Sequence, residues 1–551
     1  MDRILFTAPE SGSGKTLAVL AFLEVLRRRG LRPAAFKCGP DFIDPMFHRA
    51  VLKEEVSNLD SFFSGEDDLR ALFLKRAEGA DLAVIEGVMG YYDGLGGTGE
   101  RASTYDVGRI LSAPAVLVVN GKRSSFSLAA LVRGFREFRP DSRIRGVILD
   151  RVKPAMARAL APVIEVETGV PVLGCLPESD AYRLDSRHLG LVLPGEVAGL
   201  RGMISAAADA LAQNTDIGRI LRIAGEAPEL QGVCKAAELQ DAGDTQKLQD
   251  AGDAQKLQNA GGSSEPRVRT DAASLEKERR VKIGVALDEA FCFYYRDNLE
   301  LLQSFGAEPV YFSPLHDCSL PEGISGLILG GGYPELHARA LSENEAMRAA
   351  VRAAFLSGMP CLAECGGFLY LHERLEDTDG IMQPMAGVFP FSARKTDRLD
   401  RFGYITVTAK GQTGQEESII LREDPSQDGP ALLAGGEEIR GHEFHYWESE
   451  DPGSSWRAAK PSGRGWDCMH VRGAQAAGFP HLYYPSAPEF LKRWTDCCRA
   501  FGRMMHKAEP AGTDAAGTGL TGTDPKGKDA VKTGLTGTGL TGTDQEELKD
   551  G

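Results

Sequence analysis

The sequence predicts an α/β protein with two domains, each built on a mainly parallel β-sheet. Short apolar runs alternate with segments of helical spacing in two blocks, at about 1–225 and 279–505. Such alternation is typical of parallel sheets covered by helices. A stretch of small and polar residues, too poor in apolar side chains to form a core, separates the blocks. The 551 residues also exceed the usual length of one domain.

Five apolar runs in the first block are expected to be buried strands. They are RILFTA (3–8), AAFKCG (34–39), LAVIEG (82–87), AVLVVN (115–120) and RGVILD (145–150). Helical spacing of apolar residues is found between these runs, for example at 16–29 and 127–138. The second block begins in the same way, with VKIGVAL at 281–287 followed by a predicted helix at 297–305. Both blocks are therefore predicted to be α/β units.

Two segments differ from the rest in composition. Residues 226–278 contain LQDAGDTQKLQDAGDAQKLQNAGG, which repeats with a period of nine and is interpreted as a linker. Residues 506–551 contain copies of TGLTGT and are interpreted as a disordered tail. The predicted organisation is thus a first α/β domain at 1–225, the linker at 226–278, a second α/β domain at 279–505, and the tail at 506–551.

Composition excludes several classes of protein. The net charge of −15 argues against a general nucleic-acid or membrane binder, whose surface would be basic. The ten cysteines show neither zinc-ligand spacing nor a disulfide framework. The start of the chain does not follow the pattern of a signal peptide, and no apolar run approaches the length of a membrane span. We therefore expect a cytoplasmic protein with reduced thiols.

A phosphate-binding loop is predicted at TAPESGSGKT, between the first strand and the first helix. The nucleotide-binding residues of this loop are expected to be Gly12, Ser13, Gly14, Lys15 and Thr16. Glycines let backbone N–H groups face an anion, the lysine contributes positive charge, and the threonine hydroxyl can bind Mg²⁺. The G-x-x-x-x-G-K-T pattern is incomplete because Pro9 stands at its first glycine. A purely structural glycine turn is the alternative, but such turns rarely carry Lys-Thr at this place.

Charged residues follow the second and third strands. KCGPDFIDPMFH contains Lys37, Asp41 and Asp44, and IEGVMGYYDG contains Glu86 and Asp93. Side chains at the carboxyl ends of strands in an open α/β sheet face the usual ligand crevice. Mg²⁺ favours one or two carboxylates together with phosphate oxygens. The pattern indicates a site for Mg-ATP beside a substrate, where a carboxylate is activated as an acyl phosphate. ATP hydrolysis used as a switch is equally compatible with it.

A cysteine lies at a sharp turn in the second block. In PCLAECGGFLYLHERL, a short buried strand is expected to end before Cys365, and the GGFLYLHERL that follows it is expected to form a helix. A thiol at a helix N-terminus is expected to have a stabilised thiolate. Cys361 lies inside the strand and is interpreted as a small buried residue.

A cysteine nucleophile also needs an oxyanion site and a base. The strand ending in LILGGGYPELH is expected to present backbone N–H groups at Gly331 and Gly332. The base is one of His442 and His445, in RGHEFHYW, or His481, in FPHLYYP. The residues themselves do not choose among these histidines.

Motifs spread over residues 1–500 together resemble one family, the cobyrinate a,c-diamide synthases, which are glutamine amidotransferases of cobalamin biosynthesis. In chain order the motifs are SGSGKT, KCGPDFIDP, EGVMGYYDG, RHLGLV, FCFYYRDNLELLQSFGAEPVYFSPL, GGGYPEL, ECGGFLYL, GHEFHYWE and HLYY. The resemblance implies a dethiobiotin-synthetase-like P-loop domain followed by a class I glutamine amidotransferase domain. The implied ligands are cobyrinate, L-glutamine, ATP and Mg²⁺, and a homodimer is left open.

The resemblance also implies a role for each matching residue. Cys365 matches the nucleophile and His481 the histidine that activates it. The pair His442 and His445 matches a motif assigned to the substrate face of the domain. In the first domain, Lys15, Thr16, Asp41 and Glu86 match the positions for ATP and Mg²⁺, and the last three of these are the implied metal ligands. Lys37, Asp44 and Asp93 match residues near the carboxylate being activated.

The chain departs from the family pattern at a few positions. Asp150 stands where an asparagine is expected near the nucleotide base. Ala363 replaces the first glycine of the cysteine turn, and Tyr483 stands where many class I enzymes have the glutamate of a triad, which this branch generally lacks. The same chemistry on hydrogenobyrinate or nickel-sirohydrochlorin is an alternative. A different class, a P-loop ATPase switch with an inactive glutaminase-like module, is the other; the intact cysteine turn counts against it.

Overall fold

A seven-stranded, fully parallel sheet organises the first half of the chain. The computed structural model describes residues 1–184, 186–187, 190–191, 193–230, 280–399, 401–410 and 431–508. The strand order is β3-β2-β4-β1-β5-β6-β7. The strands are β1 (Arg3–Thr7), β2 (Pro33–Cys38), β3 (Ser57–Leu59), β4 (Leu82–Glu86), β5 (Ala115–Asn120), β6 (Ile144–Asp150) and β7 (Val172–Leu176), and a separate two-stranded ribbon is formed by β8 (Ser186–Arg187) and β9 (Gly190–Leu191).

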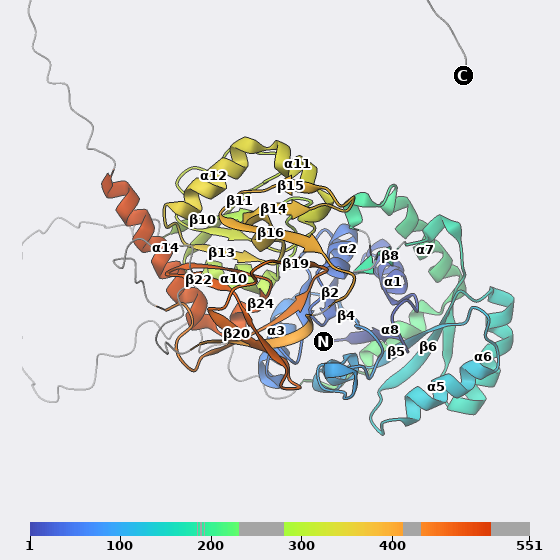
Figure 1. Ribbon diagram of the computed structural model, residues 1–551. Coiled ribbons are helices and arrows are strands. Elements are labelled where there is room, and N and C mark those ends of the chain that lie inside the picture. Colours follow the sequence, from blue (N-terminus) through green and yellow to red (C-terminus); the bar gives the residue numbers. More distant parts are fainter. Residues whose placement is uncertain are drawn as a thin grey trace, which may run out of the picture. The chain divides into compact units, whose positions relative to one another are not determined.

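Helices cover both faces of this sheet (Figure 1). They are α1 (Lys15–Arg28), α2 (Ile43–Leu52), α3 (Glu66–Arg76), α4 (Thr104–Ile110), α5 (Ser127–Glu137), α6 (Pro154–Thr168), α7 (Leu200–Asn214) and α8 (Ile217–Gly225). Alternate residues of a strand enter different cores: Ile4 and Phe6 pack with α1, α2, α7 and α8, whereas Leu5 packs with α3 to α6. Because these strands are buried on both faces, the sequence shows continuous apolar runs there.

The second half contains a six-stranded sheet of order β11-β10-β12-β13-β23-β22, parallel except for its last pair. Two smaller sheets, β15-β14-β16-β19 and β21-β20-β17-β18-β24, accompany it. The strands are β10 (Val281–Ala286), β11 (Ala307–Phe312), β12 (Leu327–Leu329), β13 (Cys361–Glu364), β14 (His372–Glu376), β15 (Met382–Pro384), β16 (Phe389–Lys395), β17 (Phe402–Ala409), β18 (Glu438–Phe444), β19 (Trp447–Ser449), β20 (Trp456–Ala459), β21 (Gly465–Cys468), β22 (His470–Arg472), β23 (Gln475–Gly478) and β24 (His481–Leu482). The helices are α10 (Arg296–Ser304), α11 (Ala338–Glu343), α12 (Glu345–Leu356), α13 (Gly366–Leu371) and α14 (Pro488–Ala508).

The predicted fold class is confirmed: both halves are α/β, and the first is a parallel sheet with a P-loop. The domain boundaries stay predictions, because most of the expected linker (226–278) and tail (506–551) lies outside the described residues. One local expectation was wrong. The helix after Cys365 ends at Leu371, and the HERL segment that the sequence assigned to it forms strand β14 instead.

Residues 1–506 form one compact unit, within which the two halves contact each other. Arg76 of α3 forms partly buried ion pairs with Asp297, at 2.7 Å, and with Glu300, at 2.5 Å. An aromatic cluster lies at the same junction; it comprises Phe42, Phe62, Phe63, Tyr295, Tyr404 and Tyr483. These contacts bring the carboxyl ends of the first sheet close to the residues that follow β12 and β13.

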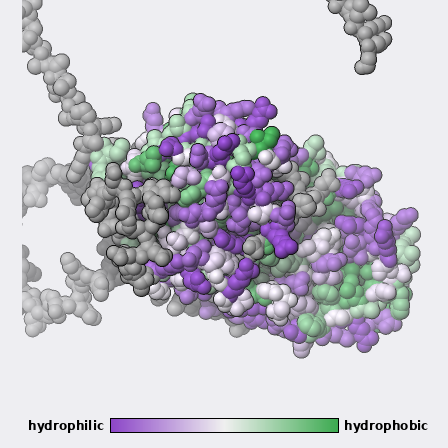
Figure 2. All heavy atoms as spheres, viewed as in Figure 1, coloured by the Kyte–Doolittle hydropathy of each residue, from purple (hydrophilic) through white to green (hydrophobic). Residues whose placement is uncertain are grey.

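The surface in the view of Figure 2 is mostly hydrophilic, with apolar side chains gathered near α5 and α6. Exposed apolar residues at these helices include Phe126, Phe138, Met156 and Val166. Among the described helices, none combines the length and the apolar character needed to cross a membrane.

Candidate active site

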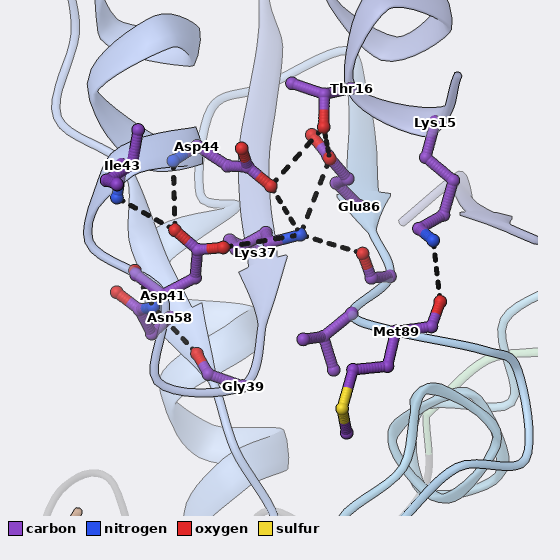
Figure 3. A network of polar contacts seen from close by, with 12 residues as sticks. Lys15, Thr16, Lys37, Gly39, Asp41, Ile43, Asp44, Asn58, Glu86 and Met89 are labelled. Carbon is purple, nitrogen blue, oxygen red and sulfur yellow. Dashed lines mark hydrogen bonds and ion pairs between the residues drawn. The ribbon is translucent and has the colours of Figure 1, made fainter. Parts of the chain in front are cut away.

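The loop between β1 and α1 has the backbone that a phosphate-binding loop requires. Gly12 and Gly14 have φ of +78° and +86°, a region that residues with a side chain rarely adopt. Lys15 Nζ donates to the carbonyl oxygens of Met89, at 2.6 Å, and Glu10, at 3.1 Å (Figure 3). Burial, together with the nearby charge of Lys37, lowers the pKa of Lys15 to about 8. An anion bound at this loop would therefore relieve the repulsion between two ammonium groups.

Lys37, at the end of β2, is the centre of a buried polar cluster (Figure 3). Its Nζ lies 2.7 Å from Asp44 Oδ2 and 3.4 Å from Glu86 Oε1, and it donates to the carbonyl oxygen of Gly87 at 2.8 Å. Burial alone would lower the pKa of Lys37, but Asp44 and Glu86 outweigh burial and raise the pKa above its usual range. Burial and the like charges of Asp41 and Glu86 raise the pKa of Asp44 well above its usual range.

Glu86, at the end of β4, is fully buried beside Lys37. Burial opposes its ionisation, but Lys37 and His48 hold the pKa of Glu86 well below its usual range. His48 Nε2 lies 2.5 Å from Glu86 Oε2. Thr16, the hydroxyl of the phosphate loop, donates to Glu86 Oε1 at 2.6 Å. The end of β4 is thus tied both to the phosphate loop and to α2.

The two aspartates at the start of α2 take different places. Asp44 Oδ2 lies 3.4 Å from Thr16 Oγ1, whereas the carboxylate of Asp41 accepts the backbone N–H groups of Ile43 and Asp44 at 2.8 and 3.0 Å. Asp41 therefore caps α2 and stays 4.0 Å from Lys37 Nζ. The structure thus brings Asp44, rather than Asp41, to the predicted metal-binding threonine.

Asp93, predicted near the activated carboxylate, lies in the loop after β4. Its Oδ2 accepts the backbone N–H of Gly90 at 3.0 Å, and the residue lines the same cavity as Thr16 and Lys37. The predicted residues of the first half are thus gathered at one edge of the sheet.

Cys365 sits at a strained turn between β13 and α13. Its φ of +47° and ψ of −101° lie outside the regions that non-glycine residues normally occupy. A side chain on Gly367 would lie 2.1 Å from the carbonyl oxygen of Leu329, so the turn packs directly on β12. The sequence predicted a stabilised thiolate, but burial and the carboxylates of Glu335 and Glu443 raise the pKa of Cys365. The six-residue helix does not offset that environment, so the resting group is the thiol.

His481 opens the short strand β24 beside the glycine loop that follows β12. A Cβ on Gly331 would lie 2.3 Å from His481 Cε1, and a Cβ on Gly366 would lie 3.0 Å from the backbone nitrogen of Gly332. The predicted oxyanion loop, the cysteine turn and this histidine are therefore neighbours. Burial, with His442 and His445 adding, lowers the pKa of His481 well below its usual value. The ring is a neutral base at ordinary pH.

The three candidate histidines are close together but have different surroundings. His442 is the register partner of His481 across β18 and β24, and their rings stack at 4.8 Å. Burial lowers the pKa of His442 to about 3. His445 Nδ1 donates to the carbonyl oxygen of Trp447 at 2.8 Å, and its Nε2 lies 3.4 Å from the buried carboxylate of Glu443. Among the three, His481 packs directly against the Gly331 backbone.

One cavity of about 2330 Å³ joins the two groups of residues. Lys15, Thr16 and Asp44 line it from the first half, and Gly332, Cys365 and His481 line it from the second. The cavity residues that sequence reasoning missed include Phe42, Glu335 and Glu443. The only local signal was the position of Phe42 between two aspartates in PDFIDP; the others become relevant only through tertiary packing.

Comparison with known proteins gives the class of this chain. Residues 4–192 match the CobQ/CobB/MinD/ParA nucleotide binding domain, and residues 282–476 match the CobB/CobQ-like glutamine amidotransferase domain. The chain is therefore a nucleotide-binding domain joined to a glutamine amidotransferase domain in one polypeptide.

Relatives of nearly full length narrow this class. The chain is 35% identical to the cobyrinate a,c-diamide synthase of Caldanaerobacter subterraneus subsp. tengcongensis, over 91% of this chain and 100% of the relative. It is 36% identical to the enzyme of the same name from Listeria innocua, over 89% and 98%. It is also 36% identical to the hydrogenobyrinate a,c-diamide synthase of Streptomyces coelicolor, over 91% and 98%. The chain belongs to the cobyrinate a,c-diamide synthase family, whose members are glutamine-dependent amide ligases.

Proposed function

We propose that this chain converts the a- and c-acetate carboxylates of cobyrinate into amides, using ATP and glutamine. One observation supports this most directly: the phosphate loop and the cysteine turn line a single cavity of about 2330 Å³. Pockets for drug-sized ligands usually have volumes of 300 to about 1000 Å³. The larger cavity suits a macrocyclic substrate bound together with a nucleotide.

In the glutaminase half-reaction, Cys365 Sγ attacks the carboxamide carbon of glutamine. Its proton passes to a ring nitrogen of His481, because the buried thiol is protonated and the buried histidine is neutral. The backbone N–H groups of Gly331 and Gly332 stabilise the oxyanion. His481 returns this proton to the leaving nitrogen as the intermediate collapses, which releases ammonia and leaves a thioester. Water then hydrolyses the thioester to glutamate and the free thiol.

In the ligase half-reaction, a substrate carboxylate attacks the γ-phosphorus of ATP, giving an acyl phosphate and ADP. Lys15 and the phosphate loop neutralise the charge on the transferred group. Lys37 lies among carboxylates and positions the acceptor end of the site. Ammonia then attacks the acyl carbon and inorganic phosphate leaves, which completes the amide.

The residues around Thr16 fit a magnesium ion. Asp44 Oδ2 and Glu86 Oε1 lie 3.4 and 2.6 Å from the threonine hydroxyl, and hard oxygen ligands are what Mg²⁺ prefers. Within the described residues, no group of three or more His, Cys, Asp or Glu side chains is arranged to hold a metal by itself. Mg²⁺ held by Thr16 and a carboxylate, with phosphate oxygens as its other ligands, would supply charge neutralisation for phosphoryl transfer.

Hydrogenobyrinate is the second candidate substrate, because a relative of that specificity is as similar to this chain as the cobyrinate enzymes are. A homodimer and a cytoplasmic location stay predictions.

The experiment is amidation of cobyrinic acid by the purified chain with ATP, Mg²⁺ and glutamine, followed by mass spectrometry of the corrinoid. Hydrogenobyrinic acid and nickel-sirohydrochlorin serve as parallel substrates. Two successive exchanges of a hydroxyl for an amino group on cobyrinate are expected. ATP hydrolysis without glutamine turnover or corrinoid amidation would instead favour a switch ATPase with an inactive module.

A further inference from the structure

Phe42, a residue of the nucleotide-binding domain, reaches into the glutaminase site. Its ring contacts four rings of the other half of the chain: Phe293, stacked at 5.1 Å, Tyr295 at 4.6 Å, His442 at 5.5 Å and His481 at 5.3 Å. It is therefore in contact with the base that the proposed function assigns to glutamine hydrolysis.

The backbone that carries Phe42 is held firmly. Asp41 accepts the N–H groups of the two residues after Phe42, at 2.8 and 3.0 Å. The side chain of Asn58 donates to the carbonyl oxygens of Gly39 and Asp41, both at 2.8 Å. These bonds fix the turn at the start of α2, so the position of the Phe42 ring is set by the first domain.

One ring nitrogen of His481 lacks a polar partner among the described residues. Its Nδ1 is buried and finds no hydrogen-bond partner among the described residues. In a cysteine–histidine pair a third group normally holds the imidazole in the orientation that accepts the proton. Here three packing contacts confine the ring: His442 stacks on it at 4.8 Å, the Gly331 backbone adjoins its edge, and Phe42 packs at 5.3 Å.

We propose that Phe42 is a positioning residue for His481, so that the nucleotide-binding domain supplies part of the glutaminase site. The ring takes over the orienting role of the absent polar partner, because a close-packed contact restricts the rotation of the imidazole. This inference rests on the proposed function, since it assumes that His481 is the base for Cys365. It further implies that the amidotransferase domain alone is a poor glutaminase.

The test measures glutamate release from glutamine, which needs no corrinoid, together with amidation driven by free ammonia. Phe42→Ala removes the ring, and Phe42→Leu keeps an apolar side chain of similar volume. The matched control is Phe63→Ala. Phe63 is a buried aromatic of the same domain and the same junction; it stacks on Tyr483 at 4.8 Å and lies 6.5 Å from His442, with no recorded ring contact to His481.

Phe42→Ala is expected to lower kcat for glutamine hydrolysis at least tenfold, with KM for glutamine changed less than threefold. Ammonia-dependent amidation should fall much less than glutamine hydrolysis, even though Phe42 also lines the shared cavity, and Phe42→Leu should recover most of the lost kcat. The inference is overturned if Phe42→Ala hydrolyses glutamine normally, or if Phe63→Ala loses the same activity, since the effect would then come from domain docking. If the wild-type chain released no glutamate, the proposed function itself would be wrong. If the wild type released glutamate and Phe42→Ala did so at the same rate, only the role of Phe42 would be refuted.

Discussion

Asp150, at the end of β6, is a buried carboxylate pressed against the phosphate loop. A Cβ on Gly14 would lie 2.5 Å from its Oδ2, and this oxygen is buried without a hydrogen bond. Arg151 Nε approaches Oδ2 to 3.2 Å, an ion-pair distance without hydrogen-bond geometry. Burial raises the pKa of Asp150 from 3.8 to about 6, against the opposing effect of Arg151. The ionised carboxylate is thus disfavoured in the folded protein.

The substitution Asp150→Asn removes the free-energy cost of ionising this buried carboxylate and keeps the side chain nearly the same size. The folded state binds the proton more tightly than the unfolded state, so the wild type loses stability as pH rises from about 4 to about 6. The full difference in pKa corresponds to about 3 kcal/mol. Relative to the wild type, the variant should therefore gain about 1 kcal/mol in free energy of unfolding at about pH 4.5 and up to about 3 kcal/mol at about pH 7.5. The gain is smaller at low pH because Asp150 is then mostly protonated in the folded wild type.

The assay is thermal unfolding of the wild type and the variant at these two pH values. For domains of this size a stability change of about 1 kcal/mol shifts Tm by about 2–4 °C. The difference in Tm between the variant and the wild type should therefore widen by several degrees at the higher pH. Asp180→Asn is the control, because it removes a charge from an exposed residue that lines the same cavity. A Tm difference that does not change with pH, or an equal pH-dependent Tm difference for Asp180→Asn, would refute the reasoning. A tighter apparent affinity of Asp150→Asn for ATP is the expected functional companion, since a negative charge leaves the phosphate loop.

Three further outcomes follow from the buried groups. Lys37→Met should destabilise the protein by about 3–5 kcal/mol, because it removes the cation paired with buried Asp44 and leaves buried Glu86 with only His48 and Thr16 as partners. The variant should also abolish amidation from either nitrogen source. Lys122→Met, which breaks an exposed pair, should cost less than about 1 kcal/mol in the same denaturation experiment. Cys361→Ala should leave glutaminase activity within about twofold, since Cys361 is fully buried in β13, and a large loss would show that this thiol has a role. The pH profile of kcat/KM for glutamine should stay flat through pH 6.5, because the pKa of His481 is lowered and that of Cys365 is raised; an acid limb at or above 6.5 would contradict the neutral pair.

Local patterns were enough to predict the fold class and several of its turns. The apolar runs, the phosphate loop and the turn at Cys365 are each encoded in a few consecutive residues, and the structure has strands, helices and turns there. The length of the helix after Cys365 was predicted wrongly because GGFLYLHERL has helical spacing, whereas pairing with β15 and β16 draws its second half into a sheet.

Contacts between residues that are far apart in the chain could not be predicted from local sequence patterns. The stacking of His442 on His481 depends on the register of β18 and β24, and the contact of Phe42 with His481 depends on how the two halves meet. The different places of Asp41 and Asp44 depend on which carboxylate caps α2, a choice that both residue types allow. Burial decides the pKa of Cys365, and a motif does not report burial.

The central claim is that glutamine is split at Cys365 and that its nitrogen is used at the phosphate-loop site. The most direct test supplies glutamine labelled in its amide nitrogen, or labelled ammonium, to the wild type and to Cys365→Ser, with cobyrinate and Mg-ATP. The wild type should transfer label from both sources to the corrinoid, whereas Cys365→Ser should transfer it from ammonium alone, at a rate near that of the wild type. Label transfer from glutamine by Cys365→Ser, or loss of the ammonium reaction in that variant while it remains folded, would contradict the two-site account.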